Sequence, residues 1–246
     1  MIEAILAHLY KIEIPLPNNP LKTINSYLIK GSVRNLIIDT GMNREECERV
    51  MQAGLETLGA DLRKTDFSIT HFHVDHLGLV SSIKADNGPV YLGRPDAGRL
   101  KRIIGGSLWT DMIDFTLMNG FPEVEIQEIL DNHPANRYGF KGDLSFRSLE
   151  DGDTLSVGSY LFRCVATPGH TKGHMCLHEL DKKIFVAGDH ILNEITPNIS
   201  LRSNAENPLK EYLESLDKVK RLNKIGLVLP GHGKPLKNYQ ERIDEL

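Results

Sequence analysis

The sequence predicts a mixed α/β (α+β) fold in which residues 1–246 form a single domain, with a helical insertion at residues 94–142. Short strand patterns followed by a helical pattern occur twice, once in each half of the chain. Between the halves, apolar residues change to a helical spacing. Hydrophobic residues make up 40% of the chain and charged residues 25%, an ordinary balance for a globular protein with a substantial core.

The first half begins with two strand patterns, at residues 25–31 and 35–41, and the Gly-Ser pair between them predicts an antiparallel hairpin. Asn43 then offers an N-cap for a helix, and Gly59 offers its stop. The apolar face of that helix is predicted to consist of Cys47, Val50, Met51, Leu55 and Leu58. A further strand is expected at residues 67–70.

The insertion is predicted to be helical. One apolar stripe consists of Ile104, Leu108, Met112 and Phe115. Pro122 opens a second helical piece that carries Val124, Ile129 and Leu130. The stripe suits three roles, which the sequence leaves open: packing in the core, a lid over a pocket, or the interface of a homodimer.

The second half contains three more strand patterns, at residues 160–168, 174–180 and 183–189, of which the last two are joined by a short turn. The Asn-Pro pair at residues 207–208 is a cap and first-turn signal for a helix. One face of that helix carries Leu209, Tyr212, Leu213, Leu216 and Val219. A final apolar strand follows at residues 225–230, so the strand-then-helix order of the first half recurs.

The charge and composition argue against several classes of protein. The net charge is −4 with histidines neutral, and no long Lys/Arg cluster occurs, so a nucleic-acid partner is not expected. No apolar run approaches about 20 residues, so no membrane span is expected, and the N-terminus lacks the basic flank of a signal peptide. Cys47, Cys164 and Cys176 are odd in number and irregularly spaced, which favours free thiols and a cytoplasmic location.

Metal-competent side chains cluster at the ends of the predicted strands. The segment 71–76, His-Phe-His-Val-Asp-His, places four of them after one strand. Strand alternation is expected to put His71, His73 and Asp75 on one side, with His76 set by the following turn. Single candidates follow later strands, namely His170, Asp189 and His232. Because loops at one sheet edge converge, we expect these side chains to meet.

These motifs resemble those of the metallo-β-lactamase-fold superfamily, over nearly the whole chain apart from the insertion. The match consists of His-x-His-x-Asp-His at 71–76, then Pro-Gly-His, Gly-Asp and Gly-His in the family's order. The resemblance implies a four-layer αββα sandwich with two metal ions at one edge. By position, the implied ligands are His71, His73 and His170 for one ion, Asp75, His76 and His232 for the other, and Asp189 bridging both.

The resemblance also implies the chemistry. Zinc is favoured by this mixture of imidazole and carboxylate ligands, with iron and manganese as alternatives. A hydroxide bridging two divalent ions would attack the carbonyl of a small-molecule substrate, because metal binding lowers the pKa of water from about 15.7 to about 7. Asp75 is the predicted catalytic residue, which would orient the nucleophile or carry a proton to the leaving group.

Further polar residues lie near the predicted ligands. Asp39 matches a recurrent acidic position of the superfamily and is expected to accept a hydrogen bond from a ligand histidine. His174 and His190 are candidates for a supporting role, with a purely structural role as the alternative. Because ligand pockets are largely apolar, the predicted substrate-pocket residues within the insertion are Trp109, Met112 and Phe115.

Branches of the superfamily differ at single positions. His73 stands where flavodiiron-type oxidoreductases usually carry Glu, and Asp189 is generally absent from zinc β-lactamases of the antibiotic-resistance type. The segment 167–174 is similar to that of glyoxalase II, related thioesterases and N-acyl homoserine lactonases, although the lactonase tyrosine is not identified here. The predicted function is therefore a binuclear metal-dependent hydrolase of an ester, thioester or lactone. A phosphodiesterase acting on a small phosphoester and a mononuclear iron persulfide dioxygenase are the alternatives.

Overall fold

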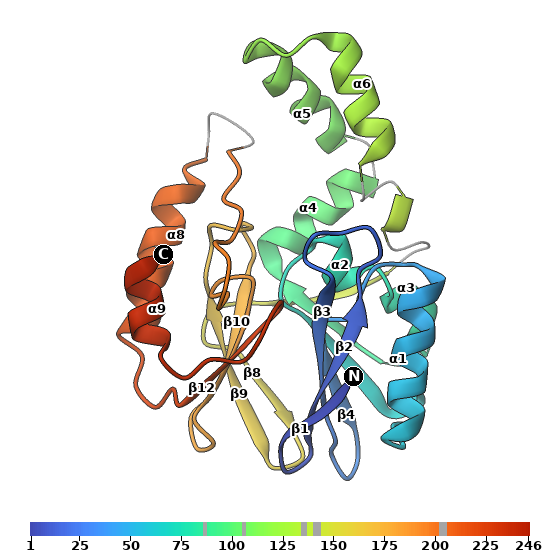
Figure 1. The fold of residues 1–246 in the computed structure, drawn as a ribbon, viewed down its shortest axis with the longest axis vertical. Helices are drawn as coiled ribbons and strands as arrows, with labels where there is room; N and C mark the ends of the chain where they lie inside the picture. Colours follow the sequence, from blue (N-terminus) through green and yellow to red (C-terminus); the bar gives the residue numbers. More distant parts are fainter. Residues whose placement is uncertain (86–87, 105–106, 134–136, 140–143, 202–205) are drawn as a thin grey trace.

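The computed structural model describes residues 1–246 except 86–87, 105–106, 134–136, 140–143 and 202–205. In the helices of the insertion, the structure describes the backbone but not the side chains of residues 104, 107–109, 111, 112, 127 and 129. The described chain folds into two β-sheets, and helices lie on their outer sides (Figure 1).

The first sheet has seven strands whose order in space follows their order in the chain. Strands β1 to β4 pair in antiparallel fashion, and β4 to β7 pair in parallel. In order from β1 to β7, their bounds are Ile2–Leu6, Leu9–Pro15, Thr23–Ile29, Asn35–Ile38, Thr65–Ile69, Val90–Gly93 and Phe146–Leu149. Because β5 and β6 are parallel neighbours, the loops that follow them start at the same edge of the sheet.

The second sheet has five strands in the order β12-β11-β10-β9-β8. In order from β8 to β12, their bounds are Thr154–Val157, Tyr160–Ala166, Met175–Glu179, Ile184–Gly188 and Leu227–Pro230. The pairs from β8 to β11 are antiparallel, and β11 and β12 are parallel. Strands β9, β11 and β12 therefore run in one direction, and their carboxyl ends lie at one edge.

Three apolar clusters separate the layers. On β3, Tyr27 and Ile29 belong to the cluster between the two sheets, whereas Leu28 belongs to the cluster under the helix α1 (Glu45–Thr57). This alternation is the two-residue period of a strand buried on both faces. The third cluster packs the second sheet against α8 (Pro208–Lys220) and α9 (Tyr239–Glu245). The predicted αββα sandwich is confirmed.

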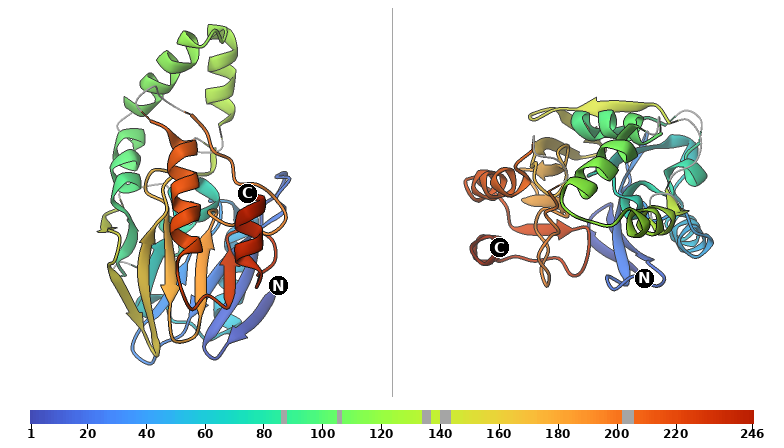
Figure 2. Two further views of the ribbon diagram at one scale, coloured as in Figure 1. Left: turned by 90° about the vertical axis from the view of Figure 1, so that its left-hand side faces the viewer. Right: turned by 90° about the horizontal axis from the view of Figure 1, so that it is seen from above.

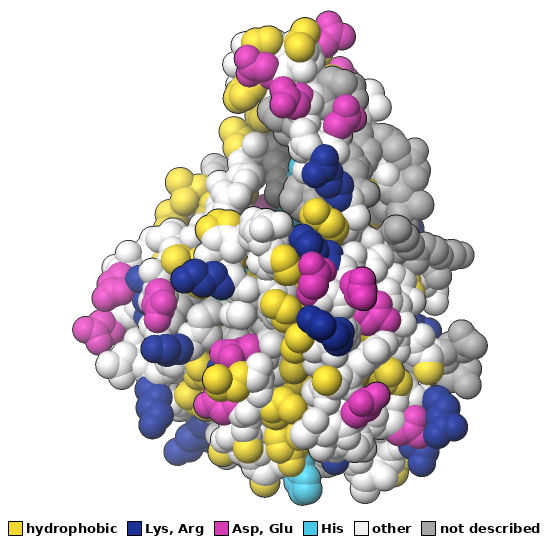
Figure 3. Space-filling view, turned by 45° about the vertical axis from the view of Figure 1, so that its right-hand side comes forward, with side chains coloured by type: hydrophobic (Ala, Val, Ile, Leu, Met, Phe, Trp, Pro, Cys, Tyr) yellow, Lys and Arg dark blue, Asp and Glu magenta, His cyan; other side chains and the backbone are white. Residues whose placement is uncertain are grey.

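The described part of the insertion includes the helices α4 (Arg94–Ile104), α5 (Ser107–Met118) and α6 (Glu123–Asn132). Helix α4 contacts β6 and β7, whereas α5 and α6 project beyond one end of the sandwich (Figures 1 and 2). Acidic and hydrophobic side chains are exposed at this projecting tip (Figure 3), and the hydrophobic ones are Leu117, Met118, Phe121 and Val124. Within the described residues, no helix has the length and apolar character needed to cross a membrane.

The N-cap of α1 differs from the prediction. Arg44 occupies that position, and no side chain caps the helix. Asn43 instead accepts a hydrogen bond from the hydroxyl of Ser82, so a tertiary contact replaces the local cap. At α8, the side chain of Asn207 accepts a hydrogen bond from the N–H of Lys210, as the cap signal predicts.

Candidate metal centre

The seven predicted ligands meet at one edge of the sandwich. Segment 71–76 follows β5, and the other three ligands follow β9, β11 and β12. Ligand atoms of these residues approach one another in groups, within each of which all atoms lie within 4.8 Å of one another. Residues far apart in the sequence, such as Asp75 and His232, are therefore neighbours in space.

Strand alternation does not explain this convergence. Strand β5 ends at Ile69, and α2 (Val74–Leu77) begins directly after its N-cap, His73. The expectation that His71, His73 and Asp75 share one side holds for the two histidines, which face one cluster, and is wrong for Asp75. Successive residues of a helix point about 100° apart, and this turn places Asp75 in a different group of ligands from the two histidines.

Three ring nitrogens face one another in the three-histidine cluster, which consists of His71, His73 and His170. His71 Nε2 lies 3.0 Å from His73 Nδ1 and 3.2 Å from His170 Nε2, and the remaining pair is 3.0 Å apart. A tetrahedral ion with Zn–N bonds of about 2.0–2.1 Å separates its ligand nitrogens by about 3.3 Å. The spacing of the cluster therefore fits one small cation.

Asp75, His76 and His232 form a second group, the mixed cluster. Asp75 Oδ2 lies 3.4 Å from His232 Nε2 and 4.0 Å from His76 Nε2. His232 Nδ1 lies 2.8 Å from the carbonyl oxygen of Thr23, which fixes the tautomer of this ring. His232 therefore presents the lone pair of Nε2 to the carboxylate and to the space beside it.

Asp189 lies between the two clusters. Its Oδ2 is 3.6 Å from His170 Nε2, in the three-histidine cluster. Its Oδ1 is 3.4 Å from His76 Nε2 and 3.6 Å from His232 Nε2, in the mixed cluster. Each oxygen of one carboxylate thus faces a different cluster, which is the arrangement a carboxylate needs to serve two cations.

Buried polar atoms test whether cations fit this site. Among the described residues, His76 Nε2, His232 Nε2 and Asp189 Oδ1 are buried without a hydrogen-bond partner, although buried polar atoms nearly always have one. Burial alone would lower the pKa of His76, but the carboxylates of Asp39, Asp189 and Asp75 raise it well above its ordinary value. The site therefore offers negative charge and buried nitrogen and oxygen atoms without hydrogen-bond partners, and a divalent cation would take the place of the proton on His76.

For His71, His170 and Asp75, the pKa shifts favour the protonation states that metal ligands need. Burial, reinforced by neighbouring histidines, lowers the pKa of His71 well below its ordinary value, and burial lowers the pKa of His170. Burial would raise the pKa of Asp75, but His76 and His232 bring it down to about 2. At neutral pH the first two imidazoles are neutral and Asp75 is ionised, so all three can act as ligands.

The structure places Asp39 against a predicted ligand. Asp39 Oδ2 lies 2.9 Å from His76 Nδ1 and accepts a hydrogen bond of 2.8 Å from the hydroxyl of Thr70. Asp39 Oδ1 accepts a further bond of 2.8 Å from the Thr70 N–H. A buried carboxylate that accepts the Nδ1 proton leaves Nε2 of the ring free to bind a cation.

Asp39→Asn is expected to weaken metal binding at the mixed cluster by about 10- to 100-fold, because an amide can no longer accept all three hydrogen bonds. Calorimetric titration of the metal-free protein with Zn²⁺ measures the change. Asp217→Asn, at an exposed position of α8, is the matched control. It should leave the Zn²⁺ affinity of the mixed cluster and of the three-histidine cluster unchanged. Equal affinities in the Asp39 variant and the wild type would contradict the role.

His174 and His190 differ in what they contact. His174 Nε2 accepts a hydrogen bond of 3.1 Å from the backbone N–H of Asp189, and its Nδ1 lies 2.8 Å from the hydroxyl of Thr167. His174 thus holds the backbone of a predicted ligand. His190 packs edge-on against Tyr212 of α8 with ring centroids 5.4 Å apart, and burial lowers the pKa of His190 to about 3. His190 is therefore best described as a neutral core residue.

Asp96 lies at the site but is absent from the sequence-based candidates. It is completely buried in the first turn of α4. It accepts hydrogen bonds from the N–H of Phe72, the hydroxyl of Thr171 and the N–H of Gly173. Burial raises the pKa of Asp96 to about 6, although these donors favour the ionised form. Its partners lie 24, 75 and 77 residues away, so no local pattern marks it.

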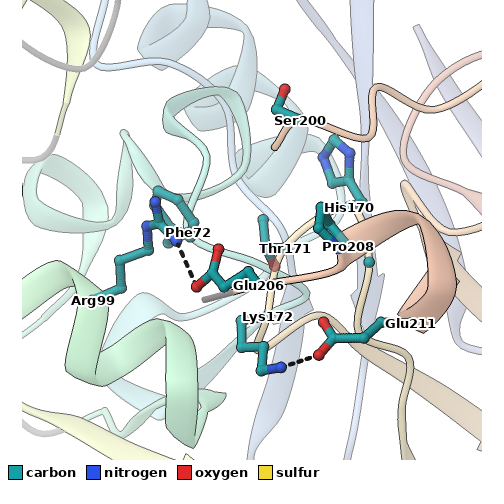
Figure 4. Close-up of a pocket in the computed structure, with 10 residues that line it drawn as sticks. Phe72, Arg99, His170, Thr171, Lys172, Ser200, Glu206, Pro208 and Glu211 are labelled. Carbon is teal, nitrogen blue, oxygen red and sulfur yellow. Dashed lines mark hydrogen bonds and ion pairs between the residues drawn. The ribbon is translucent and has the colours of Figure 1, made fainter. Parts of the chain in front are cut away.

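A small polar pocket adjoins the three-histidine cluster at His170 (Figure 4). The guanidinium of Arg99 lies over the ring of Phe72, 5.5 Å from its centroid, and 3.9 Å from a carboxylate oxygen of Glu206. These charged side chains come from α4 and from the segment before α8. The wall next to the cluster is therefore polar.

The predicted apolar pocket falls largely outside the described side chains. Phe115 is half-buried on α5 and does not line the pocket beside His170. Trp109 and Met112 belong to the same helix, but their side chains lie outside the described residues. Contact of these three residues with a substrate stays a prediction.

Sequence comparisons identify a family model and several relatives that match this chain. The family model of the metallo-beta-lactamase superfamily matches residues 20–232. An atrochrysone carboxyl ACP thioesterase from Aspergillus fumigatus is 26% identical over 228 residues, which cover 92% of this chain and 55% of the relative. The acyl-coenzyme A thioesterase MBLAC2 from Gallus gallus is 27% identical, over 85% of this chain and 72% of the relative. The chain spans 55–61% of the length of the first three relatives.

Solved structures show the same fold. A metallo-beta-lactamase family protein from Thermus thermophilus superposes with a TM-score of 0.78 and 27% identity, covering 98% of this chain and 79% of that one. A beta-lactamase domain protein from Burkholderia ambifaria gives a TM-score of 0.79 at 23% identity, over 100% of this chain and 74% of that one, which supports the fold alone. The predicted enzyme class, a hydrolase, is supported by the family and the relatives. The chain belongs to the metallo-beta-lactamase superfamily, as the order of its histidines and aspartates predicts.

Proposed function

We propose that this chain is a thioester hydrolase that depends on two divalent metal ions. The observation that carries the proposal is the position of Asp189, whose two oxygens face the three-histidine cluster and the mixed cluster. The choice of a thioester over an ester or a lactone is supported by the relatives named as ACP and acyl-coenzyme A thioesterases. Zinc is the proposed metal, because imidazole and carboxylate ligands suit it, with iron and manganese as alternatives.

We assign the proposed ligands by the distances between them: His71, His73 and His170 to one ion, Asp75, His76 and His232 to the other, and Asp189 to both. Divalent ions held there supply a hydroxide nucleophile at neutral pH and polarise the acyl carbonyl. The binuclear mechanism is supported by three buried atoms, His76 Nε2, His232 Nε2 and Asp189 Oδ1. They have no hydrogen-bond partner among the described residues.

Asp75 is the proposed catalytic carboxylate. Its side chain is 14% exposed, whereas that of His76 is completely buried, so Asp75 reaches the surface of the site. With a pKa of about 2, Asp75 is ionised at neutral pH and able to orient the nucleophile by accepting its hydrogen bond. After attack, the same carboxylate could take the proton of the added hydroxyl group and pass it to the leaving thiolate, so that the products are the carboxylate and the thiol.

A paired measurement tests the function. The metal content of the purified protein is measured, and the protein is assayed with acyl-coenzyme A thioesters, p-nitrophenyl esters, lactones and a phosphodiester. Two metal ions per chain and preferred turnover of thioesters are expected. One iron per chain with oxygen consumption on glutathione persulfide would replace the proposal by the dioxygenase, and turnover of the phosphodiester alone would replace it by the phosphodiesterase.

We also propose that the insertion forms a wall or lid for the acyl group. Helices α5 and α6 stand beyond the sandwich on the side of α2, which carries two of the proposed ligands (Figures 1 and 2). The insertion exposes apolar side chains such as Met118 and Phe121, which suit an acyl chain or a partner copy of this protein. A homodimer through this tip is the alternative.

Phe115→Ala is expected to raise KM for long-chain acyl thioesters about tenfold and to leave KM for acetyl thioesters unchanged, because only a long chain would lose an apolar contact worth about 1–2 kcal/mol. Steady-state kinetics on acyl chains of increasing length measure the effect. Leu213→Ala, at an exposed position of α8, is the matched control. A change that is independent of chain length would count against the lid.

A cytoplasmic location is proposed from the cysteines. Cys47, Cys164 and Cys176 are all free and buried. Burial raises the pKa of Cys164 and of Cys176 to about 12, which keeps these thiols protonated and unreactive. Unpaired thiols are typical of a reducing compartment.

A further inference from the structure

We infer that Asp96 is a positioning residue that holds the three-histidine cluster in its metal-binding geometry. The inference rests on the proposed metal-dependent function. Asp96 belongs to the first turn of α4, outside every motif that supplies a proposed ligand. It acts through hydrogen bonds to the two loops that carry the histidines, rather than through the rings.

Both loops are hydrogen-bonded to this single carboxylate. Phe72, the residue between the first two histidines of the cluster, donates its N–H to Asp96 Oδ2 at 3.1 Å. Thr171, the residue after the third histidine, donates its hydroxyl to the same oxygen at 2.7 Å. Gly173 donates its N–H to Oδ1 at 2.7 Å. One side chain thus fixes the position of one loop relative to the other.

The packing around Asp96 leaves little room for adjustment. The side chain is completely buried, and hydrogen bonds to an ionised acceptor are stronger than neutral ones. A Cβ added to Gly173 would lie 2.4 Å from the backbone nitrogen of Asp96, and a Cβ added to Gly93 would lie 2.0 Å from the carbonyl oxygen of Gly173. The start of α4 is therefore in direct backbone contact with the loop that follows β9.

Asp39 provides an internal comparison. Its three contacts go to Thr70 and His76, so it supports the mixed cluster. Thr70 Oγ1 also lies 3.1 Å from His71 Nδ1, so Asp39 reaches both clusters. Asp96 contacts Phe72, between His71 and His73, and two residues that follow His170, so its hydrogen bonds lie next to the ligands of the three-histidine cluster. Loss of Asp96, in contrast, should weaken the three-histidine cluster more than the mixed cluster.

The test is a titration of metal-free Asp96→Asn with Co²⁺, whose visible absorption reports the geometry of the bound ion. Reference spectra come from His73→Ala, in which only the mixed cluster is intact, and His232→Ala, in which only the three-histidine cluster is intact. The dissociation constant at the three-histidine cluster is expected to rise 10- to 100-fold, with less than about a threefold change at the mixed cluster. The first equivalent of Co²⁺ should then give the spectrum of the His73→Ala protein.

Matched variants separate positioning from general destabilisation. Thr171→Val removes one of the three hydrogen bonds without changing the shape of the side chain, whereas Thr171→Ser keeps the hydroxyl and should retain wild-type affinity. Thr171→Val also keeps the test decisive if Asp96→Asn does not fold. Glu179→Gln alters a carboxylate that is 2% exposed and hydrogen-bonded only locally, to the N–H of Lys182, and should change neither affinity.

Two outcomes would overturn the inference. Equal weakening of both clusters in Asp96→Asn would show a loss of overall stability, and wild-type affinity in Asp96→Asn and Thr171→Val would show that the loops hold their positions without the carboxylate. These results leave the proposed function intact, because the wild type would still bind two ions. A wild type that binds no Co²⁺ would instead contradict the proposed function, and the positioning role with it.

Discussion

Asp189→Ala is expected to reduce kcat/KM for thioester hydrolysis by on the order of 10³-fold or more, and to lower the metal content from two ions per chain to one or none. Both effects have one cause. The variant removes the carboxylate whose oxygens lie 3.6 Å from His170 Nε2 and 3.4 Å from His76 Nε2. Without it, each proposed ion loses a ligand, and the negative charge that holds two cations close together is reduced.

Asp189→Asn sharpens this test, because asparagine has nearly the same volume and keeps one acceptor oxygen. It should retain one ion and still lose most activity. Asp217→Ala, at an exposed position of α8, controls for the loss of a charge. Retention of two ions and of at least a tenth of the activity in both Asp189 variants would contradict a bridging role.

The fold could be predicted where an apolar period runs for several turns or alternations. Helices α1 and α8 each have 13 residues, and β9 has seven, and all three lie within about two residues of the predicted ranges. Strands β6, β7 and β8 have four residues each and were not predicted, and β1 and β2 were missed as well. The equally short β4 and β12 were predicted from their continuous apolar runs. Helix α9 was missed because its seven residues form only about two turns.

The proposed ligands could be picked out because each combines a metal-competent side chain with a strand end. Their division into two groups could not be derived from strand alternation, since α2 begins at Val74 and turns Asp75 away from His73. Asp96 could not be found at all, because its carboxylate is defined by partners on two distant loops. Local pattern thus predicts which residues bind, and tertiary contact decides which residues hold them in place.

Removing the metal ions with a chelator is expected to lower the midpoint of thermal unfolding by roughly 8–16 °C for each ion lost. An ion present at about 1,000 times its dissociation constant stabilises the folded state by about 4 kcal/mol, and a chain of this size shifts by about 2–4 °C for each kcal/mol. The structural reason is the set of buried atoms His76 Nε2, His232 Nε2 and Asp189 Oδ1, which have no hydrogen-bond partner among the described residues.

Differential scanning calorimetry before and after chelation, and after return of Zn²⁺, measures this shift. Because the ligands come from β5, β9, β11 and β12, bound ions would tie the two sheets together at their shared edge, and their loss should weaken the contact between sheets rather than a single loop. Asp189→Ala should respond much less to the chelator, since it has fewer ions to lose. An equally large shift in that variant would place the stabilising metal elsewhere, and no shift in the wild type would mean that the two clusters are held by protein contacts alone.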